Sequence, residues 1–315
     1  MKIKKKCFGG RLGFYLRVKF PKFCGDSYLL FQRKCSNYLI KKYINKMKLD
    51  KLNPLFISIE TITRCNGTCP FCPCNIHDEK RPFMYMSDEL FKKIISDLKK
   101  INYSNTLMLL ANNEILLDKN ILERLKYARI ELPNCHMKMF TNGKLLSIET
   151  FEYIINNNLV DEMIINNYND SMKLNKSIDK VYKKYRNKDI KTNVFINLRY
   201  SSEILSNRSN SSPNKKGKKI INDYCVLPYT DININPEGKL LICCCDATEK
   251  TNLGNVKNDD LIKLFNGEKY LEIRKKMLKG RSNYSFCKYC DFNDVGTRRK
   301  LIKKEMKKRM KYENS

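Results

Sequence analysis

Residues 55–198 repeat one pattern of hydrophobic and polar positions. A short β-branched, apolar run such as 55–63 is typical of a buried parallel strand, and apolar residues at helical spacing follow it after the capping residue Ser87. We predict strands at 55–63, 106–110, 135–140, 163–165 and 192–198, helices capped by Ser87, Asp118 and Ser147, and a lysine-rich helix over 172–186. The alternation predicts an α/β fold, in which a βα-repeat domain contains a parallel sheet that is open or barrel-like.

The pattern changes after residue 200. Residues 201–219 are rich in Ser, Asn and Lys, which predicts a linker. Further on, residues 231–235 and 239–245 flank Pro236-Glu237-Gly238, and this arrangement indicates a β-hairpin. Two amphipathic helices are expected near 259–265 and 268–278. We therefore expect the repeat domain over 53–212 and a smaller α+β domain over 213–315, after a basic extension over 1–52.

The net charge is strongly positive, at +29 from 62 Lys and Arg against 33 Asp and Glu. One interpretation is a polyanionic partner such as RNA or an acidic membrane surface. The other is compositional bias, because the chain is crowded with Lys, Asn and Ile and its positive charges are scattered. We favour the second. For the basic, aromatic-rich first fifty residues we favour a helical cap packed on the barrel over a surface-binding extension.

Targeting signals are weak. No apolar run approaches the ~20 residues that span a bilayer. The basic start resembles a signal peptide, but Gly9, Gly10, Arg11, Arg17 and Lys19 interrupt the apolar segment that should follow. We therefore expect a cytoplasmic protein without a transmembrane segment.

Cysteine is abundant and histidine is scarce. Fourteen cysteines in a chain expected in a reducing compartment favour metal or redox roles over disulfides. The two histidines, His77 and His136, are too few for a histidine-rich zinc or iron site. Any metal must therefore be bound mainly by sulfur.

Three cysteines form a C-x3-C-x2-C motif directly after the first predicted strand. Cys65, Cys69 and Cys72 can bind three corners of an iron–sulfur cube and leave the fourth iron open to substrate or cofactor. Gly67 and Pro70 suit so short a loop. The alternative is a zinc knuckle or a few buried thiols, but zinc sites usually pair two C-x2-C hooks or a hook with histidines. We assign no role to the neighbouring Cys74.

The motif and its place after the first strand resemble the radical S-adenosylmethionine (SAM) superfamily. The resemblance implies a partial (β/α)6 barrel and a [4Fe–4S] cluster held by the three cysteines. It also implies that the amino and carboxylate groups of SAM chelate the open iron, and that reductive cleavage of SAM yields a 5′-deoxyadenosyl radical. Phe71 would occupy the aromatic position beside the adenine.

Further positions match the family residue by residue. Glu114 fits the family's Gly-Gly-Glu segment, which contacts the amino group of SAM, although asparagines replace the two glycines. Asn142 lies in a strand-end loop that resembles the next SAM-side loop. Asn166 ends the fourth predicted strand, where a polar residue often faces the ribose. Arg199 ends the fifth, where a cation can meet the SAM carboxylate.

Four later cysteines form a second pattern. Twelve residues separate Cys225 from Gly238, four more precede Cys243, and Cys287 and Cys290 close the pattern. This spacing resembles the SPASM/twitch extension of radical SAM enzymes. With no cysteine after Cys290, the resemblance implies the shortened form, with one auxiliary [4Fe–4S] cluster held by all four thiolates.

Two questions about this second pattern stay open. The alternative to an auxiliary cluster is a zinc site with four cysteine ligands. Cys244 and Cys245 also adjoin Cys243, and strand alternation would place Cys245 on the same face as Cys243. We select Cys243 on spacing alone.

Three functions remain in view. The leading hypothesis is oxidative modification of a small polar substrate, such as a sugar or aminocyclitol, or of a peptide. In this hypothesis the auxiliary cluster accepts an electron, and flavodoxin or ferredoxin acts as electron donor. The runner-up is a radical SAM enzyme that modifies RNA, although no RNA-binding module is recognisable. The third is a non-catalytic zinc- or cluster-binding module. The sequence does not identify the substrate or the oligomeric state.

Overall fold

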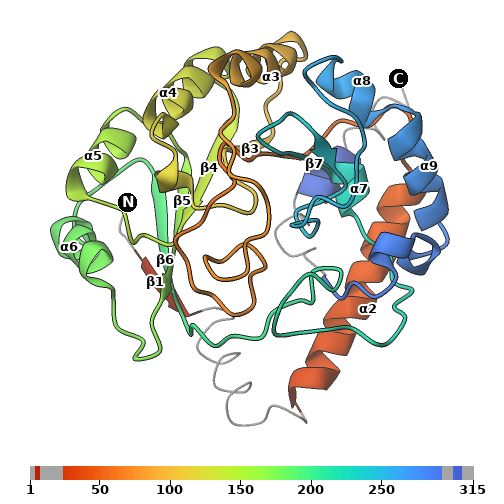
Figure 1. The fold of residues 1–315 in the computed structure, drawn as a ribbon, viewed down its shortest axis with the longest axis horizontal. Coiled ribbons are helices and arrows are strands. Elements are labelled where there is room, and N and C mark those ends of the chain that lie inside the picture. Colours follow the sequence, from red (N-terminus) through yellow and green to blue (C-terminus); the bar gives the residue numbers. More distant parts are fainter. Residues whose placement is uncertain (1–3, 8–23, 293–300, 307–315) are drawn as a thin grey trace.

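The computed structural model describes residues 4–7, 24–292 and 301–306, and a single sheet organises this part of the chain (Figure 1). The strand order is β1-β6-β5-β4-β3-β2-β7-β8, and every neighbouring pair except β7–β8 is parallel. The strands are β1 Lys4–Cys7, β2 Phe56–Ile59, β3 Thr106–Met108, β4 His136–Thr141, β5 Glu162–Tyr168, β6 Asn193–Arg199, β7 Asp231–Ile234 and β8 Leu240–Leu241. The predicted α/β fold with a parallel sheet is confirmed.

Helices cover the outer face of the curved sheet (Figure 1). They are α3 Asp88–Lys100, α4 Ile121–Glu131, α5 Ile148–Asn156 and α6 Lys176–Tyr185. Their apolar faces meet strand residues such as Met163 and Ile165, which are fully buried. The alternate residues of β5, including Asn166 and Tyr168, are only partly buried and point to the opposite face. The strands thereby present polar side chains to the concave side, where a ligand can bind.

Two of the three predicted helix caps are confirmed. Ser87 and Ser147 accept hydrogen bonds from the backbone N–H groups of Leu90 and Thr150. The prediction that Asp118 caps a helix was wrong. It ends the short 3₁₀ helix η1 Ile115–Leu117, and α4 begins only after Asn120.

The C-terminal region joins the barrel sheet. Between the linker and β7 lies α7 Leu227–Thr230, and α8 Leu261–Phe265, α9 Glu268–Met277, η2 Arg281–Asn283 and η3 Ser285–Cys287 follow β8. The predicted hairpin is confirmed, but β7 also pairs in parallel with β2, so the hairpin extends the sheet of the barrel. Its second strand is shorter than expected. It ends at Leu241, and Cys243–Cys245 lie in a turn rather than in a strand.

The N-terminal extension contributes one strand and one helix to the described fold. The sequence patterns did not predict β1, which adds to the free edge of β6. Helix α2 Cys24–Asn45 buries Ile40, Tyr43 and Ile44 in the core, which confirms a packed helix in this region. Residues 1–3 and 8–23 lie outside the described residues. Within the described part of the chain, no helix is long and apolar enough to cross a membrane.

Candidate functional site

The three-cysteine loop leaves the carboxyl end of β2 and turns back on itself. Gly67 lies inside the turn, where a Cβ atom would be 3.2 Å from Cys65 Sγ and 3.7 Å from Cys69 Sγ. The backbone N–H of Gly67 also donates to Cys65 Sγ at 3.3 Å, and that of Cys72 donates to the Cys69 carbonyl at 3.0 Å. The glycine therefore leaves open a cradle that two thiols face, and a side chain there would fill it.

Asn75 holds this loop closed. Its buried Nδ2 group donates to the carbonyl oxygens of Cys69 at 3.2 Å and Cys72 at 2.6 Å. Its Oδ1 accepts from the backbone N–H groups of His77 and Asp78. One amide thus satisfies backbone groups on both sides of the loop, which fixes the thiols in place before any ligand binds.

The thiols have unequal acidity. Burial raises the pKa of Cys65 to about 12 and that of Cys69 to about 11. The neighbouring Cys74 side chain lowers the pKa of Cys72 to about 6, and the same interaction raises the pKa of Cys74. The Cys74 thiol, to which the sequence analysis assigned no role, donates to the Ala247 carbonyl at 3.7 Å and so connects the loop to the segment after Cys245.

The chemistry of the loop suits an iron–sulfur cube. In the described part of the chain, no three His, Cys, Asp or Glu side chains converge closely enough to hold one metal ion. The thiolates of a cube bind different iron atoms and need not meet at one point. Three sulfur donors on one short loop, two of them facing the Gly67 cradle, fit three corners of such a cube.

Two of the predicted SAM contacts lie together beside the loop. Glu114 is buried, and its carboxylate accepts from Thr141 Oγ1 at 2.6 Å and from the backbone N–H of Asn142 at 2.8 Å. Asn142 Nδ2 in turn donates to Oδ1 of Asn66, inside the cysteine loop, at 2.7 Å. Burial raises the pKa of Glu114, and the bonds from Asn142 and Thr141 oppose that rise. These residues link the ends of β3 and β4 to the cysteine loop.

A second pair of predicted contacts forms an aromatic and cationic group. The Arg199 guanidinium lies 5.8 Å from the ring centroid of Phe71 and 5.1 Å from that of Tyr168. The two ring centroids are 5.8 Å apart. Arg199 also forms an ion pair with Glu203, so its charge is already partly balanced. The structure brings Phe71 and Arg199 together through Tyr168, which the sequence analysis did not identify.

Asn166 lies apart from these contacts. The expectation that it ends its strand was wrong, because β5 continues for two residues to Tyr168. Its Oδ1 accepts from Asn197 Nδ2 on β6 at 3.1 Å. The two amides form a polar pair on the concave side of the sheet.

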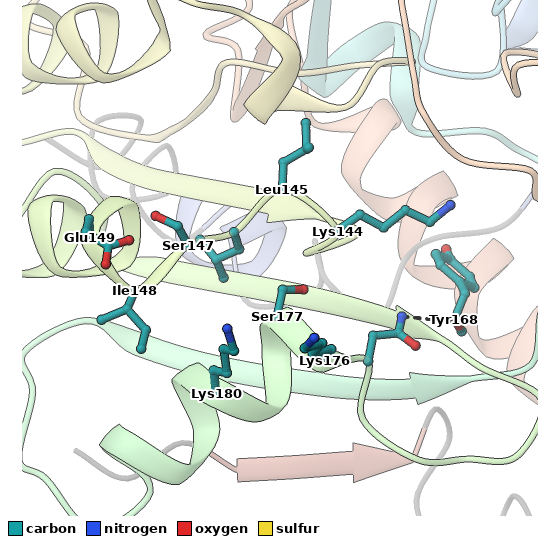
Figure 2. Close-up of a pocket in the computed structure, with 11 residues that line it drawn as sticks. Lys144, Leu145, Ser147, Ile148, Glu149, Tyr168, Lys176, Ser177 and Lys180 are labelled. Atoms are coloured by element: carbon teal, nitrogen blue, oxygen red, sulfur yellow. Dashed lines mark hydrogen bonds between the residues drawn. The ribbon is translucent and has the colours of Figure 1, made fainter.

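A cavity of about 680 Å³ opens beside this group, between the starts of α5 and α6 (Figure 2). Polar residues form much of its lining, among them Lys144, Ser147, Tyr168, Lys176, Ser177 and Lys180. Figure 2 shows the side chain of Lys144 extending toward the Tyr168 end of the cavity. Lys144 Nζ also donates to the Asn66 carbonyl at 3.1 Å. The cavity is therefore connected through Tyr168 and Lys144 to the cysteine loop.

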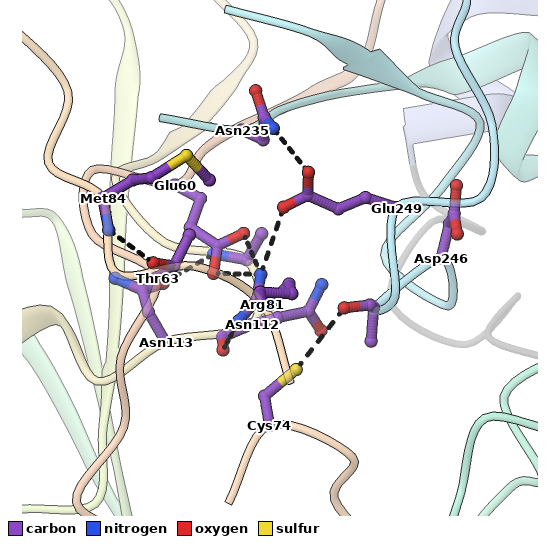
Figure 3. Close-up of polar contacts among 12 residues, drawn as sticks. Glu60, Thr63, Cys74, Arg81, Met84, Asn112, Asn113, Asn235, Asp246 and Glu249 are labelled. Carbon is purple, nitrogen blue, oxygen red and sulfur yellow. Dashed lines mark hydrogen bonds and ion pairs between the residues drawn. The ribbon is translucent and has the colours of Figure 1, made fainter. Parts of the chain in front are cut away.

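Buried charges join the barrel to the C-terminal region (Figure 3). Arg81 Nη1 donates to both oxygens of Glu60, at 3.0 and 3.1 Å, and its Nη2 donates to Glu79 at 2.8 Å. Glu249, from the loop after Cys245, approaches the same guanidinium at 3.6 Å. Three carboxylates thus surround one cation. Burial raises the pKa of Glu60 to about 7, although Arg81 opposes the rise.

This shift predicts a pH-dependent stability. The folded pKa of Glu60 is above its ordinary value of 4.5, so its contribution is complete below about pH 4.5 and is lost as pH rises through 7. The loss is on the order of 3 kcal/mol. We expect the anaerobic melting temperature to fall between pH 5 and 8, and Glu60→Gln to remove most of this fall. Glu272→Gln, at an exposed i,i+4 pair, is the control. Equal pH slopes in wild type and Glu60→Gln would contradict the assignment.

The second set of cysteines is also assembled in space. Burial raises the pKa of Cys225 to about 12, and the nearby thiols of Cys243 and Cys290 add to the rise. Cys287 interacts with the same three residues. Interactions with Cys243, Cys244 and Cys290 raise the pKa of the Cys245 thiol, so it belongs to this group as well. The structure therefore gathers the four predicted ligands and one further thiol.

Arg281 ties this group together. It is fully buried and donates to the carbonyl oxygens of Tyr224, Cys290 and Phe292 at 2.9–3.0 Å. It thereby connects the segment before Cys225 with the end of the C-x2-C hook. Its charge opposes the effect of burial and favours the thiolate form of Cys225. A buried cation among sulfur donors suits a site that binds an anionic iron–sulfur cluster.

Two family models and several known proteins match this chain. Residues 59–196 match the family model of the radical SAM superfamily, and residues 225–291 match that of the SPASM iron–sulfur cluster-binding domain. Among curated proteins, the chain is 23% identical over 250 residues to the S-adenosyl-L-methionine-dependent 2-deoxy-scyllo-inosamine dehydrogenase of Niallia circulans. That match covers 79% of this chain and 97% of the relative.

Two solved structures share the fold. BtrN in complex with AdoMet and 2-DOIA superposes with a TM-score of 0.65 at 23% identity, covering 76% of this chain and 94% of that one. BtrN in an open conformation gives a TM-score of 0.56 at 20% identity, covering 76% and 93%. The two family matches include the residues that form both cysteine groups. The chain therefore belongs to the radical SAM superfamily and carries a C-terminal SPASM iron–sulfur cluster-binding domain.

Proposed function

We propose that this protein is a radical SAM oxidoreductase that removes two electrons from a small polar substrate, such as a sugar or aminocyclitol, or from a peptide residue. Cys65, Cys69 and Cys72 would hold a [4Fe–4S] cluster, and Cys225, Cys243, Cys287 and Cys290 would hold an auxiliary one. The single observation that carries the proposal is the presence of both cysteine groups on one sheet, one at the cradle of Gly67 and one around Arg281. Two redox sites in one chain suit a two-electron oxidation in one-electron steps.

The chain's own residues would bind and orient SAM. When bound, the first cluster and SAM would together supply a 5′-deoxyadenosyl radical. Glu114 would accept a hydrogen bond from the amino group, held at the right place by Thr141 and Asn142. Phe71 would pack beside the adenine and Asn166 would face the ribose. Arg199 would bind the SAM carboxylate while keeping its ion pair with Glu203, so that one guanidinium would contact two carboxylates.

The electrons and protons of the oxidation balance. A hydrogen atom leaves the carbinol carbon and becomes part of 5′-deoxyadenosine. The hydroxyl proton and one further electron leave next, which converts the alcohol to a carbonyl. An auxiliary cluster held by Cys225, Cys243, Cys287 and Cys290 would be the acceptor for that electron. An external one-electron donor, such as flavodoxin or ferredoxin, would supply the electron that SAM cleavage consumes.

The curated relative supports an aminocyclitol as the first substrate to test, since it is described as a 2-deoxy-scyllo-inosamine dehydrogenase. We expect the anaerobically reconstituted, reduced protein to convert that compound to its ketone with one 5′-deoxyadenosine per product, measured by liquid chromatography with mass detection. 5′-Deoxyadenosine without ketone would reject this substrate but retain the radical chemistry. Fully loaded protein that forms no 5′-deoxyadenosine under any reduction would contradict the proposed function itself.

A further inference from the structure

The segment between β6 and α7 contains an unusual backbone conformation. Arg208, Ser209 and Asn210 have φ angles of 46°, 56° and 65°. Residues other than glycine enter this left-handed region at a cost in free energy, and they normally do so singly. Three in succession persist only where surrounding contacts determine the conformation, so this turn needs a structural cause.

Contacts on both sides hold the turn. Before it, Asn207 donates to the Tyr289 carbonyl at 2.6 Å and receives a hydrogen bond from the backbone N–H of Asp291 at 3.2 Å. After it, Ser212 is fully buried and donates to the Phe71 carbonyl at 3.0 Å. The turn is thus fastened at one end to the C-x2-C hook and at the other to the first cysteine loop.

The turn places one partly buried cation, Arg208, between the two cysteine groups. Arg208 Nη1 lies 4.0 Å from Cys72 Sγ. Its Nη2 donates to the Cys244 carbonyl and to Asn112 Oδ1, in the segment that leads to Glu114. Its recorded hydrogen-bond partners in the described part of the chain include no carboxylate. One guanidinium therefore spans the first cysteine loop, the loop after β3 and the turn after β8.

We propose that Arg208 is a positioning residue, which donates an N–H group to the Cys72 sulfur and fixes the first cysteine loop relative to the Cys243–Cys245 turn. This role rests on the proposed function, because it takes Cys72 to be a cluster ligand. A cation and a hydrogen-bond donor at a ligand sulfur stabilise the more negative, reduced state, and so raise the reduction potential. Lysine keeps the charge but lacks the planar fork that reaches two partners.

The test is an anaerobic redox titration without substrate, followed by electron paramagnetic resonance of the signal that changes when SAM is added. We expect Arg208→Gln to lower the equilibrium constant for reducing that cluster roughly tenfold, as for one lost charge-assisted hydrogen bond. Arg208→Lys should lie between Arg208→Gln and wild type. Lys216→Gln, in the same segment with its Nζ hydrogen-bonded to the Asn210 carbonyl, is the matched control and should leave the potential unchanged.

Two results would overturn the inference. One is a wild-type potential in Arg208→Gln with iron content intact. The other is an equal fall of the reduction potential in Lys216→Gln, which would show that any lost positive charge in this segment has the same effect. If Arg208→Gln does not retain the cluster, the Arg208→Lys variant is the test. A wild-type reduction potential in Arg208→Lys would show that the planar guanidinium is not needed. Because no substrate is present, these outcomes are independent of the substrate assignment, and wild-type protein without a SAM-responsive cluster would instead refute the proposed function.

Discussion

Replacing Cys69 with alanine is expected to abolish the formation of 5′-deoxyadenosine. Cys69 is the middle ligand of the loop, and its sulfur faces the Gly67 cradle beside that of Cys65. Two remaining thiols cannot hold three corners of a cube, so the first cluster should be lost or become labile. The measurement is 5′-deoxyadenosine production by reduced protein under anaerobic conditions, with iron content falling from about eight to about four atoms per chain.

The control is a cysteine outside both groups. Cys35 is a half-buried free thiol on α2, and Cys35→Ala should retain full SAM cleavage. Full cleavage activity in Cys69→Ala would refute the ligand assignment.

The fold was largely predictable because its signals are local. Capping serines at 87 and 147 and the period of buried residues belong to single elements, and each can be read from neighbouring positions. The prediction for Asp118 was wrong by two residues. Its side chain does accept a hydrogen bond from a backbone N–H, but that N–H belongs to Asn120, which precedes the helix. The pairing of β1 with β6, and of β7 with β2, depends on edges that form only when the sheet is assembled.

In the candidate site, too, the local features were predictable from the sequence and the long-range contacts were not. The cysteine loop was predictable because its ligands are close in sequence, and Glu114 and Asn142 do lie beside it. Asn75 had a usable signal, since a short polar side chain three residues after Cys72 often binds loop backbone. Arg208 had none. It lies in a segment that reads as a linker, and its contact with Cys72 joins residues 136 positions apart.

The Cys290→Ala variant should separate the two cysteine groups chemically. Cys290 lies in the C-terminal group, where its thiol interacts with Cys245 and its carbonyl accepts from Arg281. The cysteine loop after β2 is untouched, so reduced protein should still cleave SAM. Loss of one auxiliary ligand should make that site labile and remove the electron acceptor. With a true substrate, the ratio of 5′-deoxyadenosine to oxidised product should therefore rise roughly tenfold or more.

This ratio is more informative than product yield alone. A misfolded chain would lose both 5′-deoxyadenosine and product, whereas a missing acceptor loses only the product. Cys245→Ala gives the matched comparison, because Cys245 contacts Cys243 and Cys290 but is not among the four proposed ligands, so its effect should be smaller. A normal ratio in Cys290→Ala would show that the auxiliary site is not the acceptor. Wild-type protein with about four irons and one zinc would show that the second site is structural, since a zinc ion held by four thiolates carries no electron.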